Sequence, residues 1–555
     1  MSKPLTAADV QYAVDAVAEY GGLRPASRAL RVGYSLLHLH YTKARAFGLT
    51  PGGGEPDDSP DDAPIVRGRV KPGPRLQLAL PAPGEVARYI FTCAQNNTHL
   101  HLETWENLLA LAKYYHASVH VSTFSYDTAS YGKKAVKRGR EAGAEARGEL
   151  WWDPLLEPYF SDAALLVAPG LAWCGEMNIL PTAVRPLSGL ESYTGRKSGI
   201  VPHVKFAMET VASGKFEGTK FMFTTGTVTQ RNYIAKKEGL KAEFHHGYGG
   251  LLVEVDSHGH WWCRQLNADS EGVIHDLTLR VENGIVSEGA PVEAIQWGDI
   301  HVGRIRPEMI ELLWGTGGMI DVLCPRYQFM EDVLDWRARN HHEMKNPHTM
   351  FERFVTGKDD VFAELVSVAL FLKQQSFRKW CQTVVVRSNH DEAFDRWLRE
   401  ADYKADPKNA LFFLKAQVAM YEAIAAGHYK TFLPIEWAMN YIAKDGMPEI
   451  RFLRQDESFI ICADANGGIE QGHHGDKGAN GANGSLAAFA KSGRKINTGD
   501  RHSPGIYDGA YRAGVAGDLD HGYNKGMSSW ANSHIITYRN GKRAIVTVWA
   551  GKWRA

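Results

Sequence analysis

The chain has 555 residues and a mass of 61.6 kDa, enough for about three or four domains. Its 63 basic and 63 acidic side chains cancel, which excludes a uniformly basic nucleic-acid-binding protein and leaves only local basic patches for that role. The six cysteines are widely spaced and form no CxxC, which argues against a disulfide framework or cysteine-rich zinc site and predicts a reducing compartment. With no signal-like N-terminus and no long apolar run, we expect a cytoplasmic protein without a membrane partner.

The first 50 residues predict a small three-helix unit. Thr6 can cap a first helix, and its apolar face has helical spacing. This face consists of Val10, Ala13, Val14 and Val17. A second helix spans about residues 25–30, and a glycine turn leads to a third over about residues 35–47. Helix, tight turn, helix is the pattern of a helix-turn-helix unit.

Basic residues concentrate in this unit. Between Arg24 and Arg45 there are five basic residues and no acidic one, an electrostatic pattern that favours phosphate contacts. The candidate DNA-binding residues are Arg24, Arg28, His38, Tyr41, Lys43 and Arg45. The alternative is a three-helix bundle that only mediates assembly, and a homo-oligomer is left open.

Residues 51–84 predict a linker, since 14 of these 34 positions are proline or glycine. The expected domains are therefore 1–50 (helix-turn-helix), 51–84 (linker), 85–289 (an α/β domain of unknown role) and 290–555 (catalytic). In the middle domain we expect strands near 89–93, 118–122, 164–167, 220–223 and 251–255, and a helix over 104–115. It contains no dinucleotide or P-loop motif.

The C-terminal part holds five polar clusters, four of which closely follow an expected strand. They are Asp299-Ile300-His301, the carboxylates Glu331, Asp332 and Asp335, the run Asn389-His390-Asp391, the pair His473-His474, and Asp500-Arg501-His502. Ligands bind at the carboxyl ends of strands in open α/β sheets. Asp, His and Asn without Cys suit ions such as Mn, Fe, Zn or Ni, and a shared Asp predicts a two-metal phosphoester site.

The order of these clusters resembles the calcineurin-like metallophosphoesterases: D-x-H, G-D, G-N-H-D/E, H and G-H-x-H. Within that family, the stretches 332–342, 471–478 and 501–506 are most similar to the pre-early host-takeover DNases (first-step-transfer proteins) of T-five-like tailed phages. The resemblance covers about 290–555. It implies a multi-domain α/β protein whose catalytic domain is a β-sandwich flanked by helices.

The resemblance also implies residue roles. A first metal would bind Asp299, His301 and His502, Asp332 would bridge, and Asn389, His474 and Asp500 would hold the second. His390 would donate to the phosphate or leaving oxygen, with Asp391 orienting it. Arg337, Arg339, His341 and His342 could grip the scissile strand, with packing as the alternative for each.

The chain departs from the family at three positions. Glu331 and Ser388 each replace a glycine, which we interpret as a matter of backbone only. Asp500 replaces a ligand histidine, and this hard oxygen ligand favours Mn²⁺, with Mg²⁺ as the alternative, over Zn²⁺.

We therefore expect a DNA nuclease that uses two divalent ions, acting in the host cytoplasm if the chain is phage-encoded. The rival predictions are a phosphatase or nucleotide phosphodiesterase acting on small substrates, and a non-catalytic DNA-binding regulator.

Overall fold

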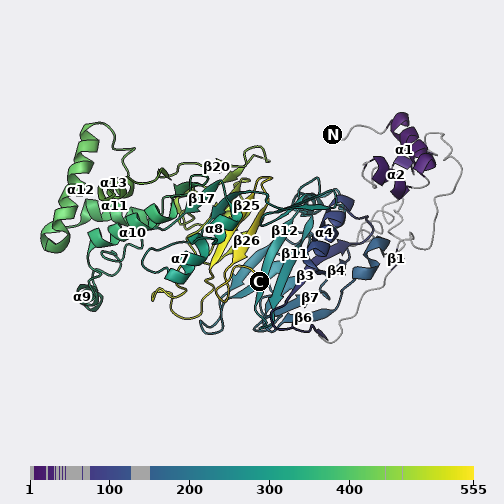
Figure 1. Cartoon of the computed structure of the whole chain (residues 1–555), viewed down its shortest axis with the longest axis horizontal. Helices are drawn as coiled ribbons and strands as arrows, with labels where there is room; N and C mark the ends of the chain where they lie inside the picture. Colours follow the sequence, from purple (N-terminus) through teal and green to yellow (C-terminus); the bar gives the residue numbers. More distant parts are fainter. Residues whose placement is uncertain are drawn as a thin grey trace.

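The computed structural model describes residues 6–20, 23–30, 32, 37, 40–41, 44, 65–66, 76–126, 150–443, 446–465 and 467–555. These residues form a mixed α/β protein with several sheets (Figure 1). No helix among them is both long and apolar enough to cross a membrane.

The N-terminal unit contains α1 (Ala7–Tyr20) and α2 (Leu23–Leu30). Thr6 caps α1 as expected, because its hydroxyl accepts from the Asp9 N–H while its own N–H donates to the Asp9 carboxylate. The expected apolar face of α1 is buried, together with Leu37 and Tyr41. Most of the expected third helix and nearly all of the linker lie outside the described residues, so the helix-turn-helix assignment stays a prediction.

The middle of the chain begins with a four-stranded sheet in the order β12-β11-β3-β4. Its strands are β3 (Val86–Gln95), β4 (Ser118–Phe124), β11 (Gly249–Asp256) and β12 (Trp261–Asn267). Helix α4 (Leu102–Tyr115) connects the parallel strands β3 and β4 and covers one face. A small sheet of β13 (Ile274–Asp276), β14 (Leu279–Glu282) and β15 (Ile285–Ser287) packs on the same side. The strands and helix expected here are confirmed.

An eleven-stranded sheet packs against the other face of these strands, in the order β2-β6-β7-β8-β10-β9-β23-β24-β22-β21-β20. Its first half is β2 (Leu76–Gln77), β6 (Ala164–Ala168), β7 (Leu171–Cys174), β8 (Ser198–Val201), β9 (Met208–Val211) and β10 (Lys220–Thr224). Its second half is β20 (Ile460–Ile461), β21 (Ile469–Glu470), β22 (Lys495–Thr498), β23 (Gly505–Tyr507) and β24 (Ala510–Arg512).

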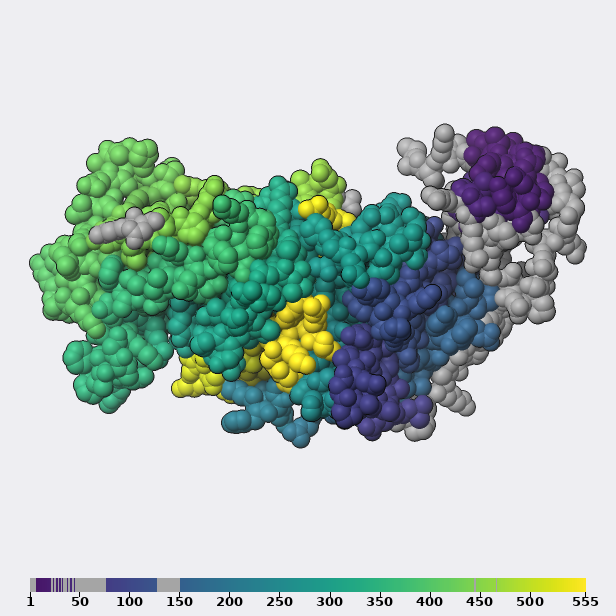
Figure 2. Space-filling view, in the orientation of Figure 1, coloured from purple at the N-terminus to yellow at the C-terminus, as the bar shows by residue number. Residues whose placement is uncertain are grey.

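This sheet revises the expected boundary at residue 290. Ile506 of β23 pairs with Met208 of β9, so strands from both sides of the boundary belong to one sheet. The two segments also share one apolar core, in which Phe221 and Val253 pack together with Ile535 and Ile545. The C-terminal end of the chain, yellow in Figure 2, accordingly reaches the surface between segments from both parts.

The third large sheet has six strands in the order β19-β18-β17-β16-β25-β26. They are β16 (Val292–Gln296), β17 (Tyr327–Met330), β18 (Gln382–Val385), β19 (Ile450–Phe452), β25 (Ser533–Tyr538) and β26 (Arg543–Thr547). Strands β16 to β19 run parallel, which brings their carboxyl ends to one edge.

Alternate residues of these strands point to opposite faces. Phe329 and Val384 pack toward β20 and β21 of the eleven-stranded sheet, whereas Met330 and Val385 pack against helices. These helices are α7 (Pro307–Trp314), α8 (Met319–Leu323), α10 (Val361–Gln375), α11 (Asn389–Glu400), α12 (Pro407–Ala425) and α13 (Pro434–Ile442). Helix α9 (Pro347–Val355) contributes no residue to this core. The C-terminal part is therefore two stacked sheets with helices on one side.

The remaining elements are short: β1 (Ile65–Val66), β5 (Trp151–Trp152), α6 (Lys237–Phe244), α14 (Leu486–Ala490), and the 3-10 helices Pro154–Tyr159, Tyr403–Ala405 and Ala479–Gly481.

Candidate metal centre

The loops after β16 and β17 hold three of the expected ligands close together. The His301 N–H donates to the carbonyl of Asp332 (2.7 Å), and the Ile300 N–H donates to that of Glu331 (3.1 Å), so the loops run side by side. Both His301 (φ 48°) and Asp332 (φ 45°) adopt the left-handed conformation, which is uncommon outside glycine. Strain of this kind persists only where the surrounding structure fixes it, and it gathers at functional sites.

Asp299, His301, Asp332 and His502 form one buried group. The Nε2 atoms of His301 and His502 are 3.0 Å apart, and the latter is 3.1 Å from Asp299 Oδ2. His301 Nε2 also lies 3.6 Å from Asp332 Oδ2. All four ligand atoms lie within 4.8 Å of one another. This is the set expected for the first metal.

Asp332 also belongs to a second group with His474. His474 Nε2 lies 3.3 Å from the same Asp332 Oδ2 that faces His301, and 4.0 Å from Asp500 Oδ1. One carboxylate oxygen thus faces both groups, which is the arrangement expected of a bridging ligand.

These buried groups fit divalent cations. Both carboxylate oxygens of Asp299, Oδ1 of Asp332 and Nε2 of His474 are buried without a hydrogen-bond partner, and buried polar atoms are normally paired. Burial raises the pKa of Asp299 to about 7, and burial lowers that of His502 to about 4, which keeps its imidazole in the neutral, ligating form. A cation bound between these atoms would satisfy them and favour the ionised carboxylates.

Glu331 is a site residue, although in the sequence it stands out only as a replacement of glycine that we interpret as a matter of backbone. Its side chain is fully buried, its Oε2 lies 3.2 Å from His474 Nδ1, and its Oε1 accepts from Gln296 Nε2 (3.1 Å). Burial raises the pKa of Glu331 to about 8. A carboxylate on Nδ1 orients an imidazole so that Nε2 faces the metal. The sequence did contain a sign of this role: Glu331 is a charged residue directly before the expected ligand Asp332, at a position where the metallophosphoesterase motif has glycine.

Asp335 lies beside Nδ1 of His301 in the way that Glu331 lies beside Nδ1 of His474. Its Oδ1 lies 3.4 Å from His301 Nδ1, and Arg304 Nε donates to its other oxygen at 2.7 Å. Its backbone carbonyl lies 2.7 Å from His390 Nδ1. His390 is thereby placed beside the cluster, with its ring centroid 4.9 Å from that of His301.

Helix α11 corrects one expectation. Asp391 does not orient His390, because its carboxylate accepts from the Ser388 N–H (3.2 Å) and closes the capping box of α11. Ser388, which replaces a glycine of the family pattern, is the N-cap of that box. Asn389, expected as a ligand, is exposed in the first turn of the helix, and its role as a ligand stays a prediction.

Gly499 allows the last ligand loop to approach the cluster. A Cβ at this position would lie 2.2 Å from oxygens of both Asp299 and Glu331. Asp500 (φ 71°) and His502 (φ 54°) follow in the left-handed conformation. The carboxylate of Asp500 is mostly buried and forms an ion pair with Arg501, whose Nε lies 3.0 Å from Oδ2. The structure therefore turns Asp500 toward His474 rather than out into a solvent-exposed turn.

His521 and Trp530 adjoin the cluster and were not expected. The His521 ring lies 4.9 Å from that of His301 and 5.4 Å from that of His502, and the Trp530 ring lies 4.1 Å from His502. Isolated aromatic residues carry no spacing pattern, so the sequence offered no signal for them.

The candidate substrate-binding residues differ in their surroundings. Arg339 is buried and forms two hydrogen bonds of 2.6 Å with Asp406, so it holds the fold together rather than gripping a substrate. Arg337 is half-buried, whereas His341 and His342 are exposed with their rings 3.9 Å apart.

Of the candidate DNA-binding residues, only Tyr41 has a described side chain. Its ring is buried in the core of the N-terminal unit, so the expected DNA contact does not hold for it. The side chains of Arg24, Arg28, His38, Lys43 and Arg45 lie outside the described part.

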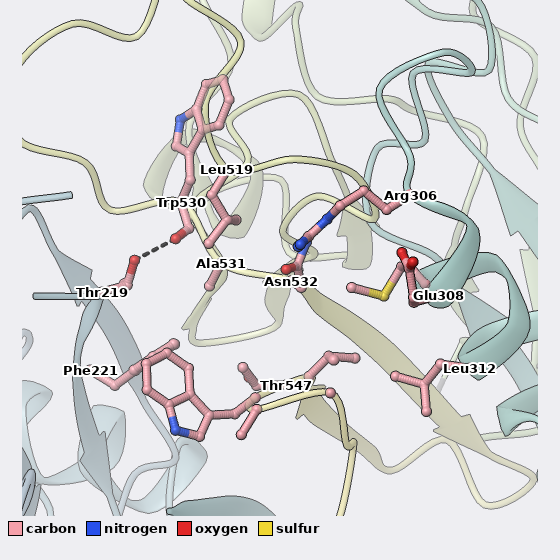
Figure 3. A pocket seen from close by; sticks show the side chains of 15 residues that line it. Thr219, Phe221, Arg306, Glu308, Leu312, Leu519, Trp530, Ala531, Asn532 and Thr547 are labelled. Atoms are coloured by element: carbon pink, nitrogen blue, oxygen red, sulfur yellow. Dashed lines mark hydrogen bonds between the residues drawn. The ribbon is translucent and has the colours of Figure 1, made fainter. Parts of the chain in front are cut away.

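Two cavities adjoin the centre. A cleft of about 530 Å³ is lined by His474, by the glycine-rich loop 472–481 and by charged residues of both signs. A second cavity, of about 560 Å³, is shown in Figure 3. At its wall the hydroxyl of Thr219 donates to the Trp530 carbonyl, while the Trp530 indole points away from the cavity toward His502. None of the expected metal ligands lines the second cavity, so only the first opens onto them.

No protein-family model and no solved structure matches the chain. Among curated proteins, Protein A1 of Escherichia phage T5 is 38% identical over 479 residues, which cover 84% of this chain and 83% of that protein. Identity of this extent over most of both chains shows common descent. The chain belongs to the family of phage T5 Protein A1.

Proposed function

We propose that this phage-family protein is a metal-dependent phosphodiesterase that hydrolyses DNA with two divalent ions. The observation that carries the proposal is Asp332, whose one carboxylate oxygen faces both His301 and His474 inside a buried, unsatisfied cluster. Pairing of two ions through a carboxylate is typical of enzymes that cleave phosphoesters.

Asp299, His301, Asp332 and His502 would hold the first ion. Asp332, His474 and Asp500 would hold the second, with its remaining positions open. When bound, the ions supply an activated water and positive charge for the phosphoryl oxygens. The mixed oxygen and imidazole ligands, with Asp500 in the second set, favour Mn²⁺ over Zn²⁺.

His390 is proposed as the acid for the leaving oxygen. Its Nδ1 is fixed on the Asp335 carbonyl, which leaves Nε2 available to a substrate at the cluster. Glu331 and Asp335 position the imidazoles of His474 and His301.

DNA is proposed as the substrate on two grounds: the resemblance to phage host-takeover DNases, and membership of a phage protein family. Degradation of host DNA in the cytoplasm of the infected cell follows from the same two grounds. The basic stretch from Arg24 to Arg45 supports a separate contact to the DNA backbone.

The test is digestion of circular and linear DNA by the purified protein with Mn²⁺, Mg²⁺ or Zn²⁺, each against an EDTA control and against Asp299→Asn. Cleavage with Mn²⁺ that EDTA and the substitution both abolish would support the proposal. Hydrolysis of p-nitrophenyl esters without DNA cleavage would favour the small-substrate alternative. Absence of bound metal after dialysis against Mn²⁺ would contradict both.

A further inference from the structure

Helix α12 carries an exposed apolar stripe along its whole length. Leu411 and Tyr421 are each 68% exposed and Val418 is 57% exposed, with Leu414 between them. These spacings of three, four and three residues repeat the a and d positions of a heptad, which bring two helices together along a seam.

The opposite side of α12 is buried against the rest of the protein. Phe412, Phe413 and Ala416 are buried in the core that α12 shares with the other helices, and they occupy heptad positions b, c and f. The a and d positions therefore point directly away from the protein. In Figure 1, α12 lies at the end of the C-terminal half, beyond α10 and α11, where a second chain could reach it.

The charges beside the stripe fit a second copy of the same helix. Lys415 and Glu422 are both exposed and occupy successive e positions, and in antiparallel helix pairs the e positions of the two chains face each other. If Val418 packs against Tyr421 of a second chain, Lys415 lies opposite Glu422 of that chain. The two-fold axis of the dimer generates the same pair a second time, so one attractive Lys415–Glu422 pair lies on each side of the axis.

Lys415 is held at the edge of this seam. Its Nζ donates to the hydroxyl of Tyr441 on α13 at 2.9 Å, which keeps the ammonium on the e side of the helix.

We propose that the protein forms a symmetric dimer in which α12 packs antiparallel against α12 of a second copy. The seam is centred on Leu414, Val418 and Tyr421, with Leu411 at its outer end, and its direction is set by Lys415 and Glu422. Exposed leucine, valine and tyrosine in one continuous row would otherwise be an aggregation hazard. The dimer does not depend on the proposed nuclease activity.

The test is sedimentation velocity over a concentration series of the full chain. Wild type should be a dimer, and Val418→Lys should be a monomer with an unchanged circular dichroism spectrum, because Val418 contributes nothing to the core. Lys415→Glu and Glu422→Lys should each raise the dimer dissociation constant about tenfold, since each turns two attractive pairs into repulsive ones.

The double variant, Lys415→Glu with Glu422→Lys, should restore wild-type affinity, because the pairs are re-formed with exchanged signs. Lys113→Glu, an exposed lysine on α4, is the matched control and should leave the dimer unchanged. A monomeric wild type, a dimer that survives Val418→Lys, or a double variant weaker than both single ones would overturn the proposal.

Discussion

The carboxylate of Asp332 lies at the centre of the buried cluster. Burial alone would raise the pKa of Asp332, but the imidazoles of His474 and His390 outweigh it and hold this pKa well below its usual value. The same carboxylate, with Glu331, outweighs burial at His474 and raises the pKa of that imidazole well above its usual value. A bound divalent cation would take the place of these protons.

Asp332→Ala should therefore remove both ions and lower turnover at least about 100-fold. Metal content after dialysis and the initial rate on DNA are the measurements. Asp464→Ala, which changes an exposed aspartate, is the matched control. Two bound ions together with a wild-type rate in Asp332→Ala would end the bridging assignment.

Glu331→Gln tests positioning rather than ligation. The amide still fills the buried space beside His474, but it no longer supplies a carboxylate to Nδ1. Such changes cost about 10–100-fold in metal affinity. We expect the Mn²⁺ titration of activity to shift to higher concentration with little change in the maximal rate. A lower maximal rate at saturating metal would instead place Glu331 in the chemistry.

Gly499→Ala should disturb the metal centre by steric clash, without removing any ligand. The added methyl would meet Asp299 and Glu331, at a cost of about 1–3 kcal/mol and a loss of metal affinity. Gly509→Ala is the control, since its nearest neighbour would be 3.6 Å away. Equal melting temperatures and metal content for the two variants would contradict this close approach.

At the scale of elements, a buried ion network joins the strands of the middle sheet. Arg264 of β12 donates to Asp276 of β13 through Nε (2.8 Å) and Nη2 (2.9 Å), and to Glu254 of β11 through Nη1 (2.5 Å). Burial would raise the pKa of Glu254, but Arg264 and Arg88 outweigh it and lower this pKa. The network thus fixes how β11, β12 and the small sheet pack.

Arg264→Ala removes the cation shared by two buried carboxylates and leaves Glu254 only Arg88 and Asp276 only the Tyr115 hydroxyl. It should cost about 3–5 kcal/mol of unfolding free energy at neutral pH. A carboxyl whose pKa is lowered by folding stabilises the protein above its unfolded pKa and loses that effect as the pH falls through its folded pKa. The difference between variant and wild type should therefore shrink as the pH falls below about 4. Urea unfolding at several pH values measures it, and a difference independent of pH would contradict this role of Glu254.

At the scale of the whole molecule, the eleven-stranded sheet joins the middle segment to the C-terminal one. A fragment of residues 290–555 would expose the edge of β23 and the apolar residues that pack on Phe221 and Val253. An unpaired apolar edge of this kind favours aggregation.

We expect residues 76–555 to fold and keep metal-dependent cleavage of a small phosphodiester, whereas residues 290–555 should be insoluble or unfolded. Circular dichroism and solubility after expression measure the difference. The longer fragment should also bind DNA with a shallower salt dependence, because the basic stretch is gone. A soluble, cooperatively folding 290–555 fragment would restore the boundary at residue 290.

The sequence by itself determined two strands of the six-stranded sheet, β16 and β18, and the types of polar residue that follow the expected strands of the C-terminal part. Local apolar runs predict strands such as that near residues 292–297, and ligands gather at the carboxyl ends of strands, so the order of the polar clusters and their resemblance to a known family were enough to group Asp299, His301, Asp332, His474 and His502. The positioning of these ligands depended on tertiary structure. Whether Glu331 faces His474, or Asp391 closes a helix cap, depends on left-handed turns and on contacts between distant loops. The strand pairing of Ile506 with Met208 likewise joins residues far apart in the chain, and no local pattern encodes it.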